Sequence, residues 1–93
     1  MSENPPVSEG QFKIERDGEI SYLAYETDGH EWISLLHTEV APKLRGRGIA
    51  GELSKMALEY AKEHHLNVEI ICPTVAHFVG KHPEYESLIS KRG

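Results

Sequence analysis

Residues 44–51 read Leu-Arg-Gly-Arg-Gly-Ile-Ala-Gly, a basic and glycine-rich turn that runs directly into an amphipathic helical pattern. The first turn of a helix has unpaired backbone N–H groups and the positive end of the helix dipole. Glycines let a bulky anion approach that backbone closely, and the arginines add positive charge. This stretch therefore predicts a site for a phosphate-bearing molecule.

A helix and a second strand are expected after the turn. The apolar stripe of the helix consists of Ile49, Leu53, Met56, Ala57, Tyr60 and Ala61. This helix should end near His64-His65, and a β-branched run at residues 68–72 should form a strand that stops at Pro73. A strand, a helix and a strand predict a right-handed crossover and a parallel pair. Two last helical segments are expected at residues 75–80 and 85–90.

Two hairpins are expected before the turn. An apolar–polar alternation at residues 12–15 resumes at residues 20–24 after Asp17-Gly18, and Asp28-Gly29 separates it from a third strand at residues 32–40. Asp-Gly pairs between alternating segments favour tight hairpins. The apolar positions of the second strand are Ile20, Tyr22 and Ala24. The order of elements predicts an α+β fold, with a mainly antiparallel sheet, one crossover helix on its face and a parallel strand pair.

The whole chain has 93 residues, which is one domain, and we expect a flexible leader at residues 1–10 before a single domain at 11–93. Its formal net charge of −5 argues against nucleic acid as a partner of the whole surface. Lys43, Arg45 and Arg47 form a local basic spot, which suits a discrete phosphate ligand. No apolar run or signal sequence predicts a membrane association, and the single cysteine favours a reducing, cytoplasmic location.

Two nucleotide interpretations of the turn fail. Residues 46–51 satisfy the G-x-G-x-x-G dinucleotide pattern, but that pattern opens a doubly wound parallel sheet, and here two hairpins come first. The P-loop pattern lacks its Gly-Lys-Ser/Thr. One alternative remains: the glycine pair before the helix serves only as a turn and binds no ligand.

Arg45-x-x-Gly48-x-Ala50 resembles the acyl-CoA pyrophosphate loop of the GNAT N-acetyltransferase superfamily. Residues 37–40, 44–51, 72–73 and 82–85 together resemble the small single-domain GNAT-like proteins of the N-acetyltransferase domain-containing type. This resemblance covers roughly residues 12–88 and implies a minimal GNAT fold that binds acetyl-CoA.

The resemblance also implies cofactor-binding residues. Amides at residues 47–50 would hold the pyrophosphate, the strand at 37–40 would hold the pantetheine arm, and the basic side chains would contact the outer phosphates. The expected set is His37, Thr38, Glu39, Val40, Lys43, Arg45, Gly46, Arg47, Gly48, Ile49, Ala50 and Gly51.

Cys72 is the chemical candidate, as an acetyl acceptor in a covalent relay or as the acid that protonates the CoA thiolate. His37, His77 or His82, or a helix starting near Thr74, could assist it. The alternative is a small buried hydrophobic residue. His82 and Tyr85 are weaker candidates, because the segment 82–85 suits a lid, a general acid through Tyr85, or a packed turn. The histidine spacing predicts no metal site.

The sequence thus predicts an acetyl-CoA-dependent N-acetyltransferase that acts on an unidentified small-molecule or protein amine. Little chain precedes the first strand to build an acceptor pocket, so we expect the acceptor in a shallow groove, at a dimer interface, or not at all. The alternatives are a non-catalytic acyl-CoA sensor or interaction module, and a structural domain without a ligand.

Overall fold

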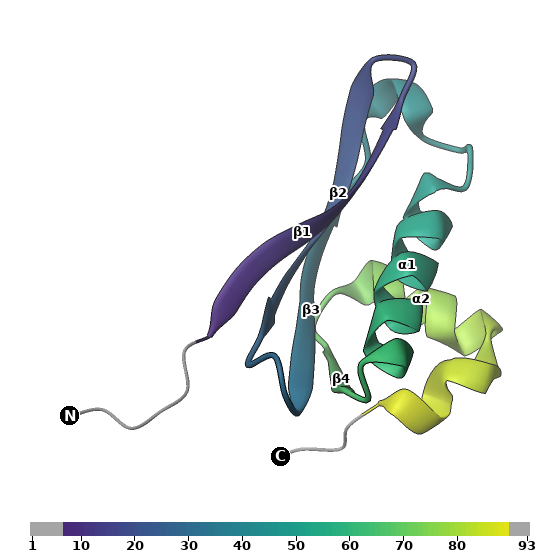
Figure 1. Ribbon diagram of the computed structural model, residues 1–93. Helices are drawn as coiled ribbons and strands as arrows, with labels where there is room; N and C mark the ends of the chain where they lie inside the picture. The colour runs from purple at the N-terminus through teal and green to yellow at the C-terminus, as the bar shows by residue number, and fades with distance from the viewer. Residues whose placement is uncertain (1–6, 90–93) are drawn as a thin grey trace.

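The computed structural model describes residues 7–89, which form a four-stranded sheet with two helices packed against it (Figure 1). The strands β1 (Ser8–Arg16), β2 (Glu19–Thr27), β3 (Trp32–Glu39) and β4 (Asn67–Ile70) lie in that order across the sheet. The helices are α1 (Ile49–Glu63) and α2 (Pro73–Lys81), and two 3₁₀ turns are η1 (Pro42–Leu44) and η2 (Pro83–Leu88).

The sheet is antiparallel from β1 to β3 and parallel between β3 and β4, which α1 connects. Asp17 and Gly18 both have positive φ, 55° and 77°, as a two-residue turn matched to the strand twist requires. One extra residue, Leu36, interrupts the β2–β3 register, because Ala24 pairs with His37 and Tyr25 pairs with Leu35. The expected α+β fold, with a crossover helix and a parallel pair, is confirmed.

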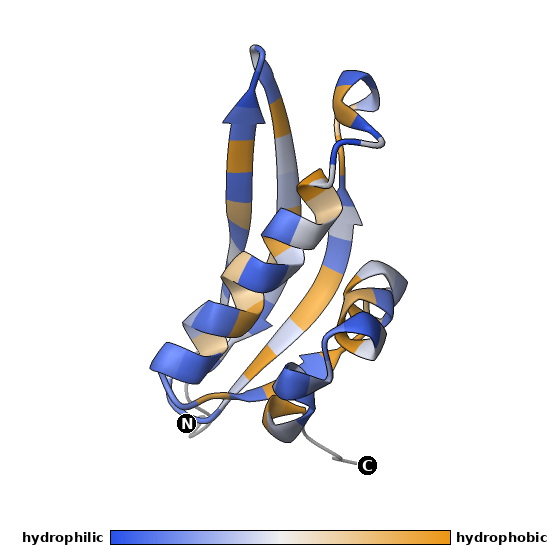
Figure 2. Cartoon of the chain, turned by 90° about the vertical axis from the view of Figure 1, so that its right-hand side faces the viewer, coloured by the Kyte–Doolittle hydropathy of each residue, from blue (hydrophilic) through white to orange (hydrophobic). Residues whose placement is uncertain are grey.

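Both helices cover the same face of the sheet, as the view onto the helix side shows (Figure 2). Side chains from this face, from η1 and from both helices form one core. Its fully buried large members include Leu23, Ile33, Leu35, Leu44, Leu53, Leu58, Val68 and Val75. Burial of each such side chain contributes about 1.5–3 kcal/mol. Because Leu44 belongs to this core, the glycine-rich turn after it begins from a fixed point.

The expected core face of β2 is wrong. The register places Leu23 opposite Phe12 and Ser21 opposite Ile14, so Ser21 and Leu23 face the helices. Ile20 points away from them and is 56% exposed. Successive strand side chains alternate between faces, so a shift of one position exchanges the two sets. The outer face of β2 also carries apolar residues, so the sequence pattern did not show which of the two alternating sets is buried.

The expected stripe of α1 is buried at Ile49, Leu53, Ala57 and Ala61, but it is wrong at Met56 and omits two buried residues. Met56 is 40% exposed, whereas Ser54 and Leu58 are fully buried. A helix covered by the sheet alone would bury a single stripe. Instead α2 also packs beside α1, where the ring of Phe78 approaches Gly51. The buried arc of the helix therefore includes the side that faces α2.

Several boundaries differ from expectation. β1 already begins at Ser8, because residues 8–10 pair with residues 25–27, and Gly10 leaves room for the Tyr25 ring. The rest of the expected leader, residues 1–6, lies outside the described residues. α2 begins at Pro73, and the last helical segment is the 3₁₀ turn η2, with the expected end at Ser90 also outside the described range. Within residues 7–89, no helix is long and apolar enough to cross a bilayer.

Candidate functional site

A groove of about 420 Å³ lies between the end of β3 and the start of α1. Eight of the twelve residues expected to bind a cofactor line it: Thr38, Glu39, Val40, Arg45, Gly46, Gly48, Ile49 and Ala50. Leu44 and Thr74 complete the lining, so η1 and the first turn of α2 also contribute. The groove therefore unites the end of one strand, the glycine-rich turn and the starts of two helices.

A larger depression of about 580 Å³ lies elsewhere, along the outer edge of α1 near Phe12 and Tyr60. Its lining includes Glu59 and Glu63, and the glycine-rich turn takes no part in it. Size alone does not identify a binding site, so the groups that line each hollow decide between them. The smaller groove has Arg45 and the backbone of the glycine-rich turn in its lining, which suit an anion.

The backbone of the turn leaves its amides available. Gly46 and Gly48 have φ of 83° and 79°, and a Cβ atom at either position would meet nothing within 4 Å. Gly48 precedes α1 and provides no side-chain cap. Among the described residues, the N–H groups of Ile49, Ala50 and Gly51 have no hydrogen-bond acceptor. Three N–H groups and the positive end of a helix dipole therefore meet open space, which is suitable for a phosphate.

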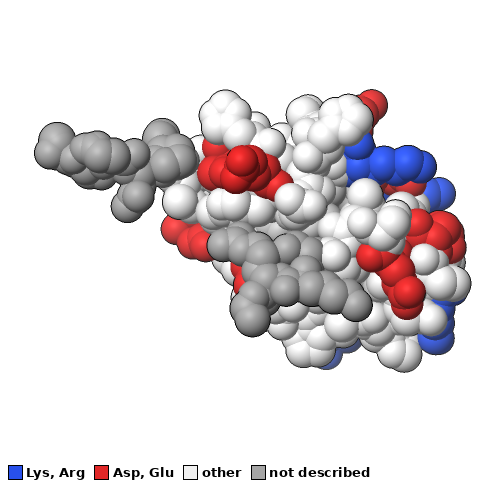
Figure 3. Space-filling view, turned by 90° about the horizontal axis from the view of Figure 1, so that it is seen from below, with Lys and Arg blue, Asp and Glu red and all other residues white. Residues whose placement is uncertain are grey.

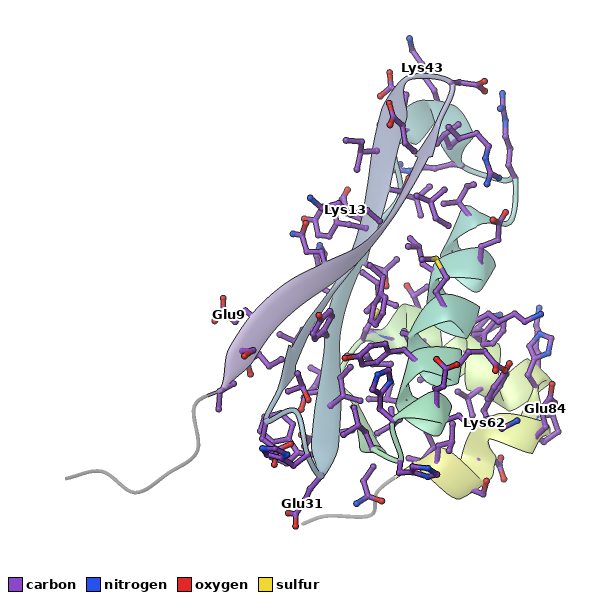
Figure 4. All side chains as sticks on the ribbon, in the orientation of Figure 1. Glu9, Lys13, Glu31, Lys43, Lys62 and Glu84 are labelled. Carbon is purple, nitrogen blue, oxygen red and sulfur yellow. The ribbon has the colours of Figure 1, made fainter. Side chains whose placement is uncertain are left out.

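The three cations of the turn differ in their surroundings. Within residues 7–89, the side chain of Arg45 has no hydrogen-bond or ion-pair partner, and it lines the groove. Arg47 instead contacts Asp17, and Lys43 approaches Glu19, both at the tip of the β1–β2 hairpin. Figure 4 shows Lys43 at the end of the molecule where this tip lies. The opposite end shows scattered acidic and basic side chains among uncharged surface (Figure 3).

The parallel strands separate beside the groove. Their register runs from Trp32 opposite Asn67 to Leu35 opposite Ile70, and it then stops. The carbonyl oxygen of Leu35 accepts hydrogen bonds from the N–H groups of both Ile71 and Cys72, at 2.9 and 3.0 Å. β3 continues to Glu39, so its last residues have no partner on the side of β4.

Cys72 lies where the strands have separated, immediately before α2, and is 3% exposed. Its sulfur lies 3.3 Å from the Thr38 hydroxyl oxygen, which brings together two residues that the sequence analysis assigned to different roles. Burial raises the pKa of the Cys72 thiol, but the Thr38 hydroxyl and the N–H groups of Val75 and Thr74 lower it. The net pKa lies below the ordinary value, although no side-chain hydrogen bond caps α2. A lowered thiol pKa favours a nucleophilic thiolate.

Comparison with known proteins agrees with the fold described above. The family model described as GCN5-related N-acetyl-transferase matches residues 11–88, nearly the whole described chain. This chain belongs to the GCN5-related N-acetyltransferase family. Protein NATD1 of Bos taurus is 37% identical over 75 residues, which are 78% of this chain and 66% of that protein. Protein NATD1 of Danio rerio is 37% identical over 79 residues, 81% and 72% of the two chains. The human protein NATD1 is 36% identical over 75 residues, again 78% and 66%. This member of the family thus spans about two thirds of those relatives' length.

Four of the residues expected to bind a cofactor do not line the groove of this GCN5-related domain. The ring of His37 lies on the outer face of β3, where its Nε2 is 3.2 Å from Glu39 and its ring meets the edge of Tyr22. Lys43 and Arg47 have the hairpin partners given above, and Gly51 packs against Phe78. Their assignment to cofactor binding stays a prediction.

The structure does not bring His82 or Tyr85 to Cys72. His82 follows α2, whose nine residues separate it from Cys72 by about 13 Å along the axis. Its ring stacks on Phe78 at 4.1 Å between ring centroids, and its Nδ1 is 3.7 Å from Glu84. The Tyr85 hydroxyl donates to Glu59 at 2.6 Å. These contacts join the segment 82–85 to α1 and α2, and the catalytic assignment of His82 and Tyr85 stays a prediction.

The sequence analysis named Thr38 and Thr74 but missed how the structure places them. The contact of Thr38 with Cys72 joins residues 34 positions apart, and no local pattern predicts it. Thr74 was named only as the start of a helix that could assist Cys72, and the structure also places it in the lining of the groove. In the part of the chain that the structure describes, no three His, Cys, Asp or Glu residues are grouped to hold a metal ion.

Proposed function

We propose that this protein binds acetyl-CoA in the 420 Å³ groove and transfers its acetyl group to an amine, with Cys72 as the nucleophile. One observation carries the proposal: the free amides of the glycine-rich turn and the low-pKa thiol belong to one continuous set of elements. The groove also fits the chemistry of acetyl-CoA, in which an amide-containing arm links a pyrophosphate to the thioester. The single cysteine further suggests a reducing, cytoplasmic compartment.

The binding residues follow from the groups left unpaired. The N–H groups of Ile49, Ala50 and Gly51, with the Arg45 side chain, would bind the pyrophosphate. The pantetheine arm contains amide groups that pair as an added strand pairs with a sheet edge. The end of β3, at residues 38–40, offers such an edge because β4 has already ended there.

Acetyl transfer through Cys72 takes two balanced steps. In the first, the Cys72 thiolate attacks the thioester carbonyl carbon, the carbon–sulfur bond to CoA breaks, and CoA leaves as a thiolate. In the second, a neutral amine attacks the same carbon on acetyl-Cys72, the carbon–sulfur bond to Cys72 breaks, and Cys72 leaves as a thiolate while the proton lost by the nitrogen passes through solvent to the CoA thiolate. Thr38 and the first amides of α2 stabilise the thiolate at the start and end of this sequence.

A second candidate is a non-catalytic acyl-CoA-binding module. The burial of Cys72 favours it, since the thiol is 3% exposed and does not itself line the groove, although its neighbours Thr38 and Thr74 do. The two candidates share the groove and differ only in whether an acetyl group moves.

The test combines titration with intact-mass measurement. Isothermal titration of the wild-type protein with CoA should show binding, and incubation with acetyl-CoA should add the mass of one acetyl group. Cys72 is the single cysteine of the chain, so a hydroxylamine-sensitive adduct identifies it. Cys72→Ala should bind CoA with similar affinity and form no adduct, and Cys72→Ser serves as the more isosteric control.

Each outcome decides one element of the proposal. An adduct that is absent from both variants and decays when amines are added supports the relay. CoA binding with no adduct and no acetylated amine supports the non-catalytic module. If millimolar CoA neither binds nor raises the melting temperature, both candidates are wrong, because a ligand of the folded state must stabilise it.

A further inference from the structure

The tip of the β1–β2 hairpin (residues 16–19) is joined to the glycine-rich turn and α1 by three ion pairs. Arg47 Nη1 lies 2.7 Å from Asp17 Oδ2, and Lys43 Nζ lies 4.0 Å from Glu19 Oε2. Arg16 contacts both carboxylate oxygens of Glu52, at 3.1 and 3.3 Å. The sequence analysis assigned no role to the acidic residues of this tip.

Two of the three cations expected to meet phosphate are therefore engaged by carboxylates of the protein itself. Arg47 and Asp17 make the shortest of these contacts, yet their side chains are 55% and 64% exposed. Exposed ion pairs contribute little to stability, because water already solvates both charges. Arg47 can thus change partner at small cost. A phosphate offers this guanidinium a charge-assisted and bidentate contact in exchange.

The position of Asp17 is fixed by the turn and not by the ion pair. Its φ of 55°, followed by Gly18 at 77°, is the geometry of a two-residue hairpin turn. Aspartate and asparagine both tolerate this left-handed conformation, which other side chains rarely adopt. The carboxylate is therefore presented to Arg47 by a rigid tip, and asparagine can replace it without loss of the turn.

We infer that Asp17 is a specificity-determining residue that occupies Arg47 in the free protein in place of a phosphate group of CoA. The inference rests on the proposed function, because it requires CoA in the groove. Binding exchanges the carboxylate of Asp17 for a phosphate on Arg47. The hairpin tip thereby lowers the affinity for ligands whose phosphate contacts Arg47, and it affects ligands that do not reach Arg47 much less.

The test is a double-mutant cycle followed by isothermal titration with CoA, 3′-dephospho-CoA and 4′-phosphopantetheine. Asp17→Asn should tighten the binding of CoA by about threefold, since it frees Arg47 while it keeps the turn. Arg47→Gln should weaken binding by about fivefold or more. In the Arg47→Gln background, Asp17→Asn should have no further effect, because the two substitutions act through one contact.

The matched control is Glu9→Gln. It removes one negative charge from the opposite end of the same strand, far from Lys43 (Figure 4). The inference is supported if Asp17→Asn increases the affinity for CoA more than Glu9→Gln does. A gain that disappears with 3′-dephospho-CoA identifies the 3′-phosphate as the partner of Arg47, and a gain that persists identifies the pyrophosphate.

Three results overturn the inference. The first is a CoA affinity that is unchanged or weaker in Asp17→Asn. The second is an equal increase of CoA affinity in Asp17→Asn and Glu9→Gln. The third is a full increase of CoA affinity when Asp17→Asn is added to Arg47→Gln, and each result would show that Asp17 does not compete with the ligand for Arg47. All three leave the proposed function intact if the wild-type protein binds CoA. A wild-type protein that does not bind CoA overturns both proposals.

Discussion

The hydroxyl of Thr38 and the sulfur of Cys72 lie 3.3 Å apart, across the point where β3 and β4 separate. This contact connects the strand that lines the groove to the residue with the altered acidity. Substitutions of Thr38 can therefore test whether its hydroxyl changes the reactivity of the Cys72 thiol.

Thr38→Val should make Cys72 less reactive, because it removes a hydrogen bond that lowers the pKa of the thiol. Hydrogen bonds to charged groups contribute about 1.5–3 kcal/mol, and a sulfur acceptor gives less, so alkylation by iodoacetamide near neutral pH should slow about three- to tenfold. The midpoint of the alkylation rate against pH should rise.

Thr38→Ser restores the hydroxyl and is the control for this prediction. Its pH profile should return toward that of the wild-type protein, whereas Thr38→Val alone should stay shifted. If the valine and serine variants share one pH midpoint, the hydroxyl does not act on the thiol.

Gly48→Glu should abolish the binding of CoA while the fold persists. Gly48 has φ of 79° and an open space at its Cβ position, so a glutamate side chain would occupy the groove with a like charge. The strain of a side chain in this conformation costs roughly 1–2 kcal/mol.

Gly29→Glu separates that strain from the effect on binding. Gly29 also has φ of 79° with nothing within 4 Å of its Cβ position, but it lies in the β2–β3 turn. Both variants should lose similar amounts of melting temperature, and only Gly48→Glu should lose binding by titration. Equal affinities in the two variants would show that the ligand does not touch the turn.

Ser21→Ala should destabilise the protein by about 1–3 kcal/mol and loosen the start of the glycine-rich turn. The buried Ser21 Oγ accepts the N–H group of Ala41 at 2.9 Å, and alanine would leave that N–H group unpaired. Urea denaturation measures the loss in free energy of unfolding, and amide exchange at Ala41 should accelerate.

The matched control is Ser54→Ala, which changes an equally buried serine. Ser54 donates to the Ala50 carbonyl within α1, so its removal leaves no N–H group unpaired. Alanine is also a better helix former by a few tenths of a kcal/mol. This variant should be neutral or slightly more stable, and a large loss in both variants would assign the effect to burial alone.

Tyr85→Phe should reduce the loss of stability at high pH. The hydrogen bond to Glu59 and burial raise the pKa of Tyr85 from 10.0 to about 12. Between these values the folded protein retains a proton that the unfolded chain releases, so this residue's contribution to stability falls as pH rises. The wild-type protein should therefore lose stability more steeply between pH 10 and 12 than the variant does. Urea denaturation across this range, with Tyr60→Phe as control, measures the difference.

Much of the groove could be predicted from the sequence, because its components are contiguous. Gly46, Gly48 and Ala50 stand in one short turn, and the positive φ of both glycines follows from local backbone preference. The strand before the turn and the helix after it are likewise local patterns. The resemblance to a known family also rests on such contiguous segments, so it does not depend on how distant parts of the chain pack.

The remainder depended on long-range geometry. Ile20 and Met56 look like core residues in the sequence, but strand register and the place of α2 beside α1 leave them exposed. The contact of Asp17 with Arg47 arises only when the hairpin tip reaches the turn. Residues so far apart in the chain show no periodicity that would associate them.

The carbonyl oxygen of Leu35, which accepts two amides at once, has a consequence for the energetics of binding. The end of the parallel ladder is stabilised by this shared acceptor, so the opening between β3 and β4 exists before any ligand arrives. Binding then needs no work to pull the strands away from each other and little loss of chain entropy. The free energy of the new contacts is not reduced by a cost of separating the strands, and the free and bound backbones should superimpose closely at residues 35–40 and 70–72.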